Sequence, residues 1–266
     1  MRKYLQIAKS TIVGYFVYRL NFLLWRLRSF LVQFLALFFF WSAIFGGRTE
    51  MFGYQKAQMF TYIIGVTFLR SLVLGSRSQS LAQQIRSGEL NNLLVRPVGI
   101  RSFWLAMDAG DKFLNLLFTT VEALLALALF KFPLYFPKNP ASYLVLIGFL
   151  IMAVLLYFFF SFTLSVIAFW TEETWATRFL IGVVLVEAFS GVYFPIDVLP
   201  VWSQNLVKMT PFPYLIFFPI KIWLEQLSPA ALIHGTAVTA SWLGIFFFGS
   251  WWLWQKGVKD YGAYGG

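Results

Sequence analysis

Residues 142–169 read SYLVLIGFLIMAVLLYFFFSFTLSVIAF, an apolar run of 28 residues without a charged side chain. About 20 apolar residues are enough for a helix to cross a hydrocarbon layer roughly 30 Å thick. The run therefore predicts a transmembrane helix, and its surplus length allows the helix to tilt or to continue into the interface.

Five other apolar runs of comparable character lie on either side, at 29–45, 57–76, 113–130, 177–194 and 230–254. Charged residues make up only 12% of the 266 residues, whereas a soluble domain carries about 25%. Too few charges remain to cover a surface that faces water. No repeat or linker marks a second domain, so residues 1–266 are predicted to form one all-α, polytopic transmembrane domain with six spans.

The basic residues between the runs predict the orientation. Fourteen Lys and Arg lie on the side that holds both termini and six on the other side, with Arg70 inside a span. Short loops rich in Lys and Arg stay in the cytoplasm, so both termini are expected there. The net charge of +10 is thereby attributed to contact with anionic lipid, and no nucleic acid is expected as a partner.

Residues 1–28 are expected to form an amphipathic helix that lies in the cytoplasmic interface. Apolar residues recur at about helical spacing, at Ile7, Val13, Phe16, Leu20 and Leu24. The bases Lys9, Arg19 and Arg26 interrupt them, and membrane lipids are the expected partners. The alternative is an extra span, which would place three bases in hydrocarbon at roughly 2.5–3.5 kcal/mol each.

Residues 191–228 are too apolar for an ordinary loop, yet they contain five prolines, which prevent one continuous helix. Broken backbone at membrane depth is tolerated where it is buried in protein or lines a wet cavity. Two short helices that enter from the outer side and return are therefore predicted between the fifth and sixth spans. An ordered loop outside the membrane is the alternative.

Several motifs are missing from the sequence, and their absence narrows the range of possible functions. The chain has no phosphate-binding loop of the type GxxxxGK[ST], no cysteine, and a single histidine, His234. Thiolate chemistry, a histidine-rich metal site and a Ser-His-Asp triad are thereby excluded. No catalytic residue, no metal and no cofactor in this chain are predicted, and the protein is not expected to be an enzyme.

The largest cytoplasmic connection, residues 78–112, carries a helical apolar stripe. Its members are Leu81, Ile85, Leu90, Leu93 and Leu94. A short amphipathic helix with a polar tip suits insertion into a groove on a partner protein. Packing of the same helix against the inner leaflet is the alternative.

Two segments resemble those of type-2 ATP-binding-cassette (ABC) exporter permeases. Ile85–Val98, IRSGELNNLLVRPV, is similar to the family's G-[TE]-L-x-x-L-L-x-x-P-[VI] segment, a coupling helix that docks on the ATPase subunit. Ser190–Trp202 together with Met209–Tyr214 resembles the family's S-G-x-x-x-P-x-x-x-L-P and T-P-x-x-Y segments, a re-entrant hairpin at the outer mouth. The order of the elements along the whole chain is also similar.

The resemblance implies a permease subunit in a bacterial inner membrane, driven by a separate ATPase that holds ATP and Mg. It also implies a second permease chain, identical or related, and an exported cargo that is amphipathic, lipidic or peptide-like. The implied coupling residues are Arg86, Gly88, Glu89, Leu90, Leu93, Leu94 and Pro97. The implied outer gate comprises Gly191, Pro195, Pro200 and Pro211, and Thr171–Arg178 would form a second cytoplasmic contact.

Three ionisable residues fall inside predicted spans, namely Arg70, Glu122 and Glu187. Ionisable groups at such depth face protein or water rather than lipid. They could line the translocation path, or they could be structural, with Arg70 pairing with one of the acids. Two other functions remain open, an ion-coupled secondary transporter that uses these acids and a membrane assembly protein that transports nothing.

Overall fold

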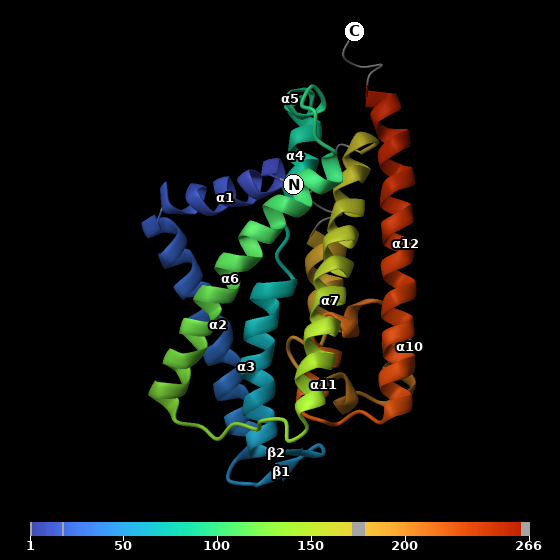
Figure 1. Ribbon diagram of the computed structural model, residues 1–266. Helices are drawn as coiled ribbons and strands as arrows, with labels where there is room; N and C mark the ends of the chain where they lie inside the picture. Colours follow the sequence, from blue (N-terminus) through green and yellow to red (C-terminus); the bar gives the residue numbers. More distant parts are fainter. Residues whose placement is uncertain (1, 18, 172–178, 262–266) are drawn as a thin grey trace.

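The computed structural model describes residues 2–17, 19–171 and 179–261, and these form a helical bundle (Figure 1). Within these residues, four helices are long and apolar enough to cross a membrane. They are α2 (Arg19–Phe45), α6 (Ile100–Phe130), α7 (Pro140–Val166, extended by η2, Ile167–Phe169) and α12 (Pro229–Tyr261). They coincide with four of the six predicted spans. The chain is thus an all-α, multi-pass membrane protein apart from one short β-hairpin.

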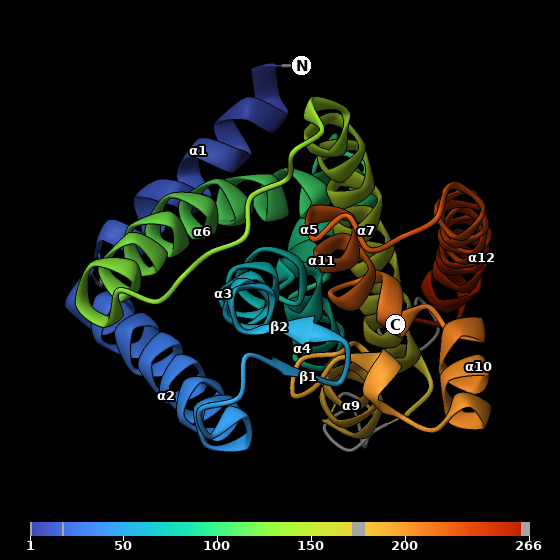
Figure 2. The same cartoon turned by 90° about the horizontal axis from the view of Figure 1, so that it is seen from below.

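The run at 57–76 forms α3 (Lys56–Val73), which lies near the centre of the bundle. Figure 2 shows α2 and α6 on one side of α3 and α7 and α11 (Phe217–Trp223) on the other. Its side chains Met59, Val66 and Val73 are fully buried. Because protein rather than lipid surrounds α3, this helix tolerates Arg70 and several hydroxyl groups. By contrast, α2 and α12 expose most of their apolar surface, as lipid contact requires.

After α3 the chain bends by 46° and continues as η1 (Arg77–Ser80) and α4 (Leu81–Arg86). Counting this bent pair as one span raises the number of candidate spans among the described residues from four to five. The short helix α5 (Asn91–Leu94) follows at the end of the molecule where α1 begins and α12 ends (Figure 1).

The amino-terminal segment differs from the single interfacial helix expected over residues 1–28. It contains two helices, α1 (Arg2–Val17), which lies across α6, and α2, which begins at Arg19. Arg26 belongs to the second and is only 6% exposed. The expected cost of basic residues in hydrocarbon applies to unpaired charges, and Arg26 has a carboxylate partner in Glu122.

The described part of the predicted fifth span is short. It comprises the π-helical turn η3 (Leu180–Leu185) and α9 (Val186–Phe189). Residues 172–178, which include nearly all of the expected second cytoplasmic contact, lie outside the described residues. The described residues therefore contain four or five candidate spans where six were predicted.

The opposite end of the molecule holds the hairpin of β1 (Glu50–Met51) and β2 (Tyr54–Gln55) and the segment before α12. That segment is a series of short helices, as its prolines predict. They are η4 (Ile196–Val198), α10 (Val201–Met209), η5 (Phe212–Tyr214) and α11. Pro195, Pro200 and Pro211 each stand directly before one of these helices, where a missing N–H costs nothing.

Candidate functional site

The predicted coupling segment forms a tip that projects from one end of the bundle (Figure 1). Between α4 and α5 the chain reverses at Gly88, whose φ of +77° is a conformation that residues with a side chain rarely adopt. We call residues 86–98 the tip.

The apolar stripe of this segment faces the chain's own core. Leu81, Ile85, Leu90 and Leu93 pack with Phe158, Phe162 and Val166 of α7, together with Trp254 of α12. Leu90 is fully buried and Leu93 is 7% exposed. These two predicted coupling residues therefore cannot meet a partner directly, and they fix the tip to the bundle instead.

The exposed surface of the tip contains the other predicted coupling residues. They are Arg86, Gly88, Glu89, Leu94 and Pro97. Asn91, Asn92 and Val95 extend the same surface, and Val95 is 83% exposed. Val95 lies within the LLVRP run, but the sequence pattern alone did not separate its outward-facing residues from the inward-facing ones. The tip thus offers a mixed polar and apolar surface on a rigid base.

The three ionisable residues predicted inside the spans all have partners. Arg70 on α3 bonds to Glu187 on α9, with 3.1 Å between its Nε and Oε1. Glu122 on α6 pairs with Arg26, at 2.7 Å between Oε1 and Nε. The predicted pairing of Arg70 with an acid is therefore present, whereas the partner of Glu122 was missed because Arg26 had been assigned to the interface.

Neutral polar groups complete both ion pairs. Arg26 also donates to Asn115 Oδ1 at 2.6 Å and to the hydroxyl of Thr119. Arg70 donates to Gln33 Oε1 at 2.5 Å. Each guanidinium thereby donates to several acceptors, and the Nε of Arg26, which makes no hydrogen bond, lies in the ion pair with Glu122. Such partners are the condition for a buried ion pair to be tolerated.

A cavity of about 570 Å³ lies among these groups, between α2, α3 and α6. Three arginines and three acids stand in its wall, namely Arg26, Arg70, Arg77, Asp111, Glu122 and Glu187. Its lining is therefore charged but balanced. We call it the charged cavity.

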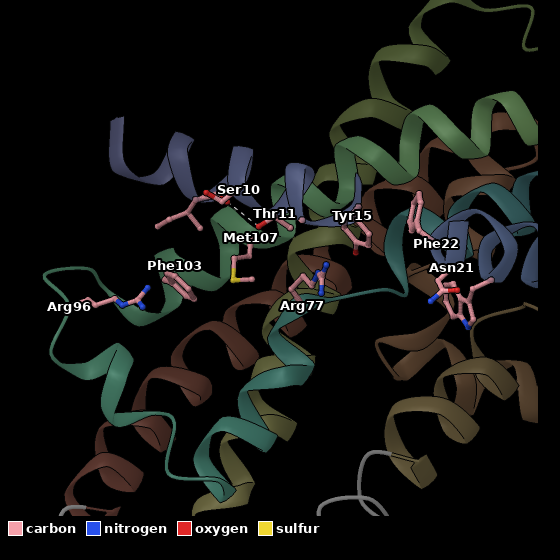
Figure 3. Close-up of a pocket in the computed structure, with 12 residues that line it drawn as sticks. Ser10, Thr11, Tyr15, Asn21, Phe22, Arg77, Arg96, Phe103 and Met107 are labelled. Atoms are coloured by element: carbon pink, nitrogen blue, oxygen red, sulfur yellow. Dashed lines mark hydrogen bonds between the residues drawn. The ribbon is translucent and has the colours of Figure 1, made fainter. Parts of the chain in front are cut away.

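Two other cavities adjoin the charged cavity. One of about 800 Å³ lies beneath α1 and shares Tyr15, Phe22, Trp25 and Arg77 with it (Figure 3). The other, of about 400 Å³, lies between α2 and α9 and shares Gln33, Arg70 and Glu187 among others. The three cavities thus share wall residues, from the end that carries α1 to the face between α2 and α9.

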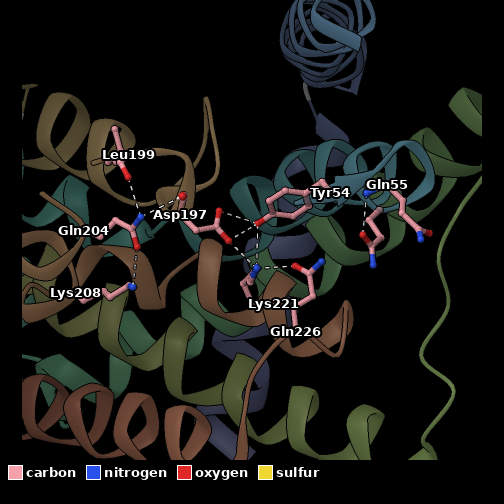
Figure 4. A network of polar contacts seen from close by, with 9 residues as sticks. Tyr54, Gln55, Asp197, Leu199, Gln204, Lys208, Lys221 and Gln226 are labelled. Carbon is pink, nitrogen blue, oxygen red and sulfur yellow. Dashed lines mark hydrogen bonds and ion pairs between the residues drawn. The ribbon is translucent and has the colours of Figure 1, made fainter. Parts of the chain in front are cut away.

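The opposite end is closed by a polar network (Figure 4). Lys221 Nζ on α11 lies 2.7 Å from Asp197 Oδ2, and the Tyr54 hydroxyl donates to the same carboxylate at 2.9 Å. Burial, reinforced by the Asp197 charge, raises the pKa of Tyr54, so its hydroxyl remains a donor. The network joins the β-hairpin, η4 and α11.

Gly191, one of the predicted gate residues, lies at a close approach of three elements. Its φ is +87°, and its carbonyl accepts a hydrogen bond from Tyr62 at 2.6 Å. A Cβ atom here would lie 2.6 Å from the Tyr62 hydroxyl and 2.8 Å from Phe217 Cβ. Only glycine fits, so the segment that begins at Gly191 is packed tightly against α3 and α11.

Among residues 2–17, 19–171 and 179–261, no group of three or more His, Cys, Asp or Glu could hold a metal ion.

A comparison with protein families gives one match. The model described as "ABC-2 family transporter protein" matches residues 31–265, which include the tip, the acids of the charged cavity and the proline-rich segment. No curated protein matches the chain.

Proposed function

The chain belongs to the ABC-2 transporter family, and from this premise we propose that it is a permease subunit and that a separate ATPase binds to it at the tip. The permease role follows from the family and from the long apolar helices. The sequence contains no phosphate-binding loop, so ATP and Mg would be bound by the partner.

The form of the tip supports this assignment. Its inner face is anchored by Leu90 and Leu93, and its outer face exposes Glu89, Leu94 and Val95. A surface that transmits force must be fixed to the body it moves, and one that binds a partner must be accessible. The tip meets both requirements.

The translocation path would follow the three adjoining cavities and include Arg70, Glu122 and Glu187. Apolar walls combined with balanced charges suit an amphipathic cargo, such as a lipid or an apolar peptide, moved outward. Both acids already have arginine partners, which gives them a structural role that an ion-coupled carrier does not require.

The complete assembly would contain two permease chains, each with six spans, in a bacterial inner membrane with both termini in the cytoplasm. The start of α1 and the end of α12 lie at the same end as the tip, in agreement with this orientation (Figure 1). The proline-rich segment, including Gly191, Pro195, Pro200 and Pro211, would form the re-entrant outer gate.

A matched pair of charge reversals tests the docking surface. Glu89→Arg reverses an exposed charge on the tip, and Glu50→Arg reverses an exposed charge on β1 at the opposite end. We expect the co-expressed ATPase to co-purify with the wild type and with Glu50→Arg, and to be lost from Glu89→Arg. Equal recovery of the ATPase with both variants would contradict docking at the tip.

A further inference from the structure

The break between α3 and η1 exposes backbone groups that need partners. Val73 ends α3, and Arg77 begins η1 after a bend of 46°. Carbonyls at the end of a helix and N–H groups at the start of the next have no partner within the helices. Inside an apolar bundle each such group is costly when left unsatisfied.

Two side chains of α6 satisfy these groups. The ammonium of Lys112 donates to the carbonyl oxygen of Gly75 and, at 3.4 Å, to that of Val73. The carboxylate of Asp108 accepts the backbone N–H of Arg77 at 2.6 Å. Lys112 is 9% exposed and Asp108 is 2% exposed, so both bonds are shielded from water.

The signs of the two charges match the groups that they meet. The carbonyl end of the long helix α3 carries partial negative charge, and a cation lies there. The first N–H after the break is a donor, and an anion accepts it. Asp108 and Lys112 are four residues apart on α6, which places them on one face of that helix. Together they span the break.

The contact continues into α1. The guanidinium of Arg77 lies 3.4 Å from Asp111 of α6 and 4.6 Å from the ring centre of Tyr15. The hydroxyl of Tyr15 donates to the same carboxylate. An ion pair joins the break to α6, a cation–ring contact joins the break to α1, and a hydrogen bond joins α1 to α6.

We propose that Asp108 and Lys112 are a positioning pair that clamps the break, so that movement of the tip is passed to α3 and to the body of α6 together instead of being absorbed at the bend. The proposal rests on the function proposed above. Farther along, α6 carries Asn115 and Glu122, which line the charged cavity. A clamped break links the ATPase-facing tip to that cavity as one body, whereas an unclamped break would act as a hinge.

The first test uses the isolated chain and hydrogen exchange. Lys112→Met keeps an unbranched apolar side chain of similar length and removes the donor. Arg101→Met is the control, because Arg101 also lies on α6 and donates to a backbone carbonyl, that of Phe247 on α12. We expect amide exchange over residues 74–95 to rise about tenfold to a hundredfold in Lys112→Met, the range that follows from losing a charged hydrogen bond.

Unchanged exchange over residues 74–95 in Lys112→Met, or an equal rise in the control, would overturn the clamp. Asp108→Asn keeps one acceptor oxygen and is expected to give a smaller rise over the same residues. It provides a second, milder variant if Lys112→Met does not fold.

The second test uses the assembled complex. The natural chain has no cysteine, so Val32→Cys, exposed in the wall of the cavity between α2 and α9, takes a single fluorescent label. We expect ATP to change the label signal, and Lys112→Met to abolish that change while the ATPase stays bound. No response to ATP without the Lys112 change would refute the proposed function. A response that persists unchanged in Lys112→Met would refute the clamp alone.

Discussion

At the scale of single residues, the buried charges show what a single sequence predicts and what it does not. Arg26, Arg70, Glu122 and Glu187 are each expensive in an apolar environment when considered singly. The structure places them as two pairs, with neutral acceptors around each guanidinium. Pairing requires knowledge of which helices are neighbours, and a single sequence does not contain it.

The Arg26–Glu122 pair gives a prediction about stability. Glu122→Gln should lower the free energy of unfolding by about 3 kcal/mol, because it leaves a buried guanidinium without its counter-charge. Replacing both partners, as Arg26→Met with Glu122→Leu, should recover most of the loss. Unfolding of the purified chain followed by tryptophan fluorescence measures both effects. A double variant as unstable as the single one would argue against the pair.

Glu225, between α11 and α12, gives a prediction about pH. Hydrogen bonds from the backbone N–H groups of Lys138 and Asn139, and from the Tyr135 hydroxyl, lower the pKa of its carboxyl to about 2. A lowered pKa in the folded state means that the contribution is complete above the ordinary value of 4.5 and is lost as pH falls through about 2.

The Tm difference between the wild type and Glu225→Gln should therefore be largest above pH 5 and should shrink to nothing near pH 2. Glu50→Gln serves as the control, since Glu50 lies exposed on β1. Its Tm is expected to follow that of the wild type throughout. A Tm difference for Glu225→Gln that does not vary with pH would contradict the assigned hydrogen bonds.

At the scale of elements, the sequence predicts the long helices well and their ends less well. The apolar runs at 113–130 and 230–254 lie within single helices, and the run at 142–169 is covered by α7 together with η2. Periodicity also predicts one helix over residues 81–94, whereas the structure has α4 and α5 with a reversal at Gly88 between them. Periodicity does not say which side is buried. The stripe that suits a partner's groove equally suits the groove between α7 and α12, and the latter is occupied.

Variants of two neighbouring leucines on the tip, Leu93 and Leu94, can distinguish a packing role from a docking role. Leu93 is 7% exposed and Leu94 is 42% exposed. Leu93→Asp should unfold the tip, because it buries a carboxylate without a partner, whereas Leu94→Asp should leave the tip folded and weaken only the binding of the ATPase. Hydrogen exchange over residues 81–95 and co-purification distinguish the two effects. Loss of protection in both variants would mean that Leu94 also belongs to the core.

At the scale of the whole molecule, the helices have a simple arrangement. Lipid-facing helices α2 and α12 flank a central helix α3 that protein surrounds on several sides. The tip and the start of α1 mark one end, and the Asp197–Lys221 network closes the other. Between them lie the charged cavity, whose wall is balanced in charge, and its two neighbours.

The most direct test of this layout is a cross-link from the tip. Because the natural chain lacks cysteine, Val95→Cys on the tip and Val201→Cys on α10 each carry a single photoreactive label at a highly exposed position. In native membranes we expect Val95→Cys to capture a polypeptide that mass spectrometry identifies as a phosphate-loop ATPase, and Val201→Cys to capture none. Capture of that ATPase from α10 and not from the tip would contradict the account.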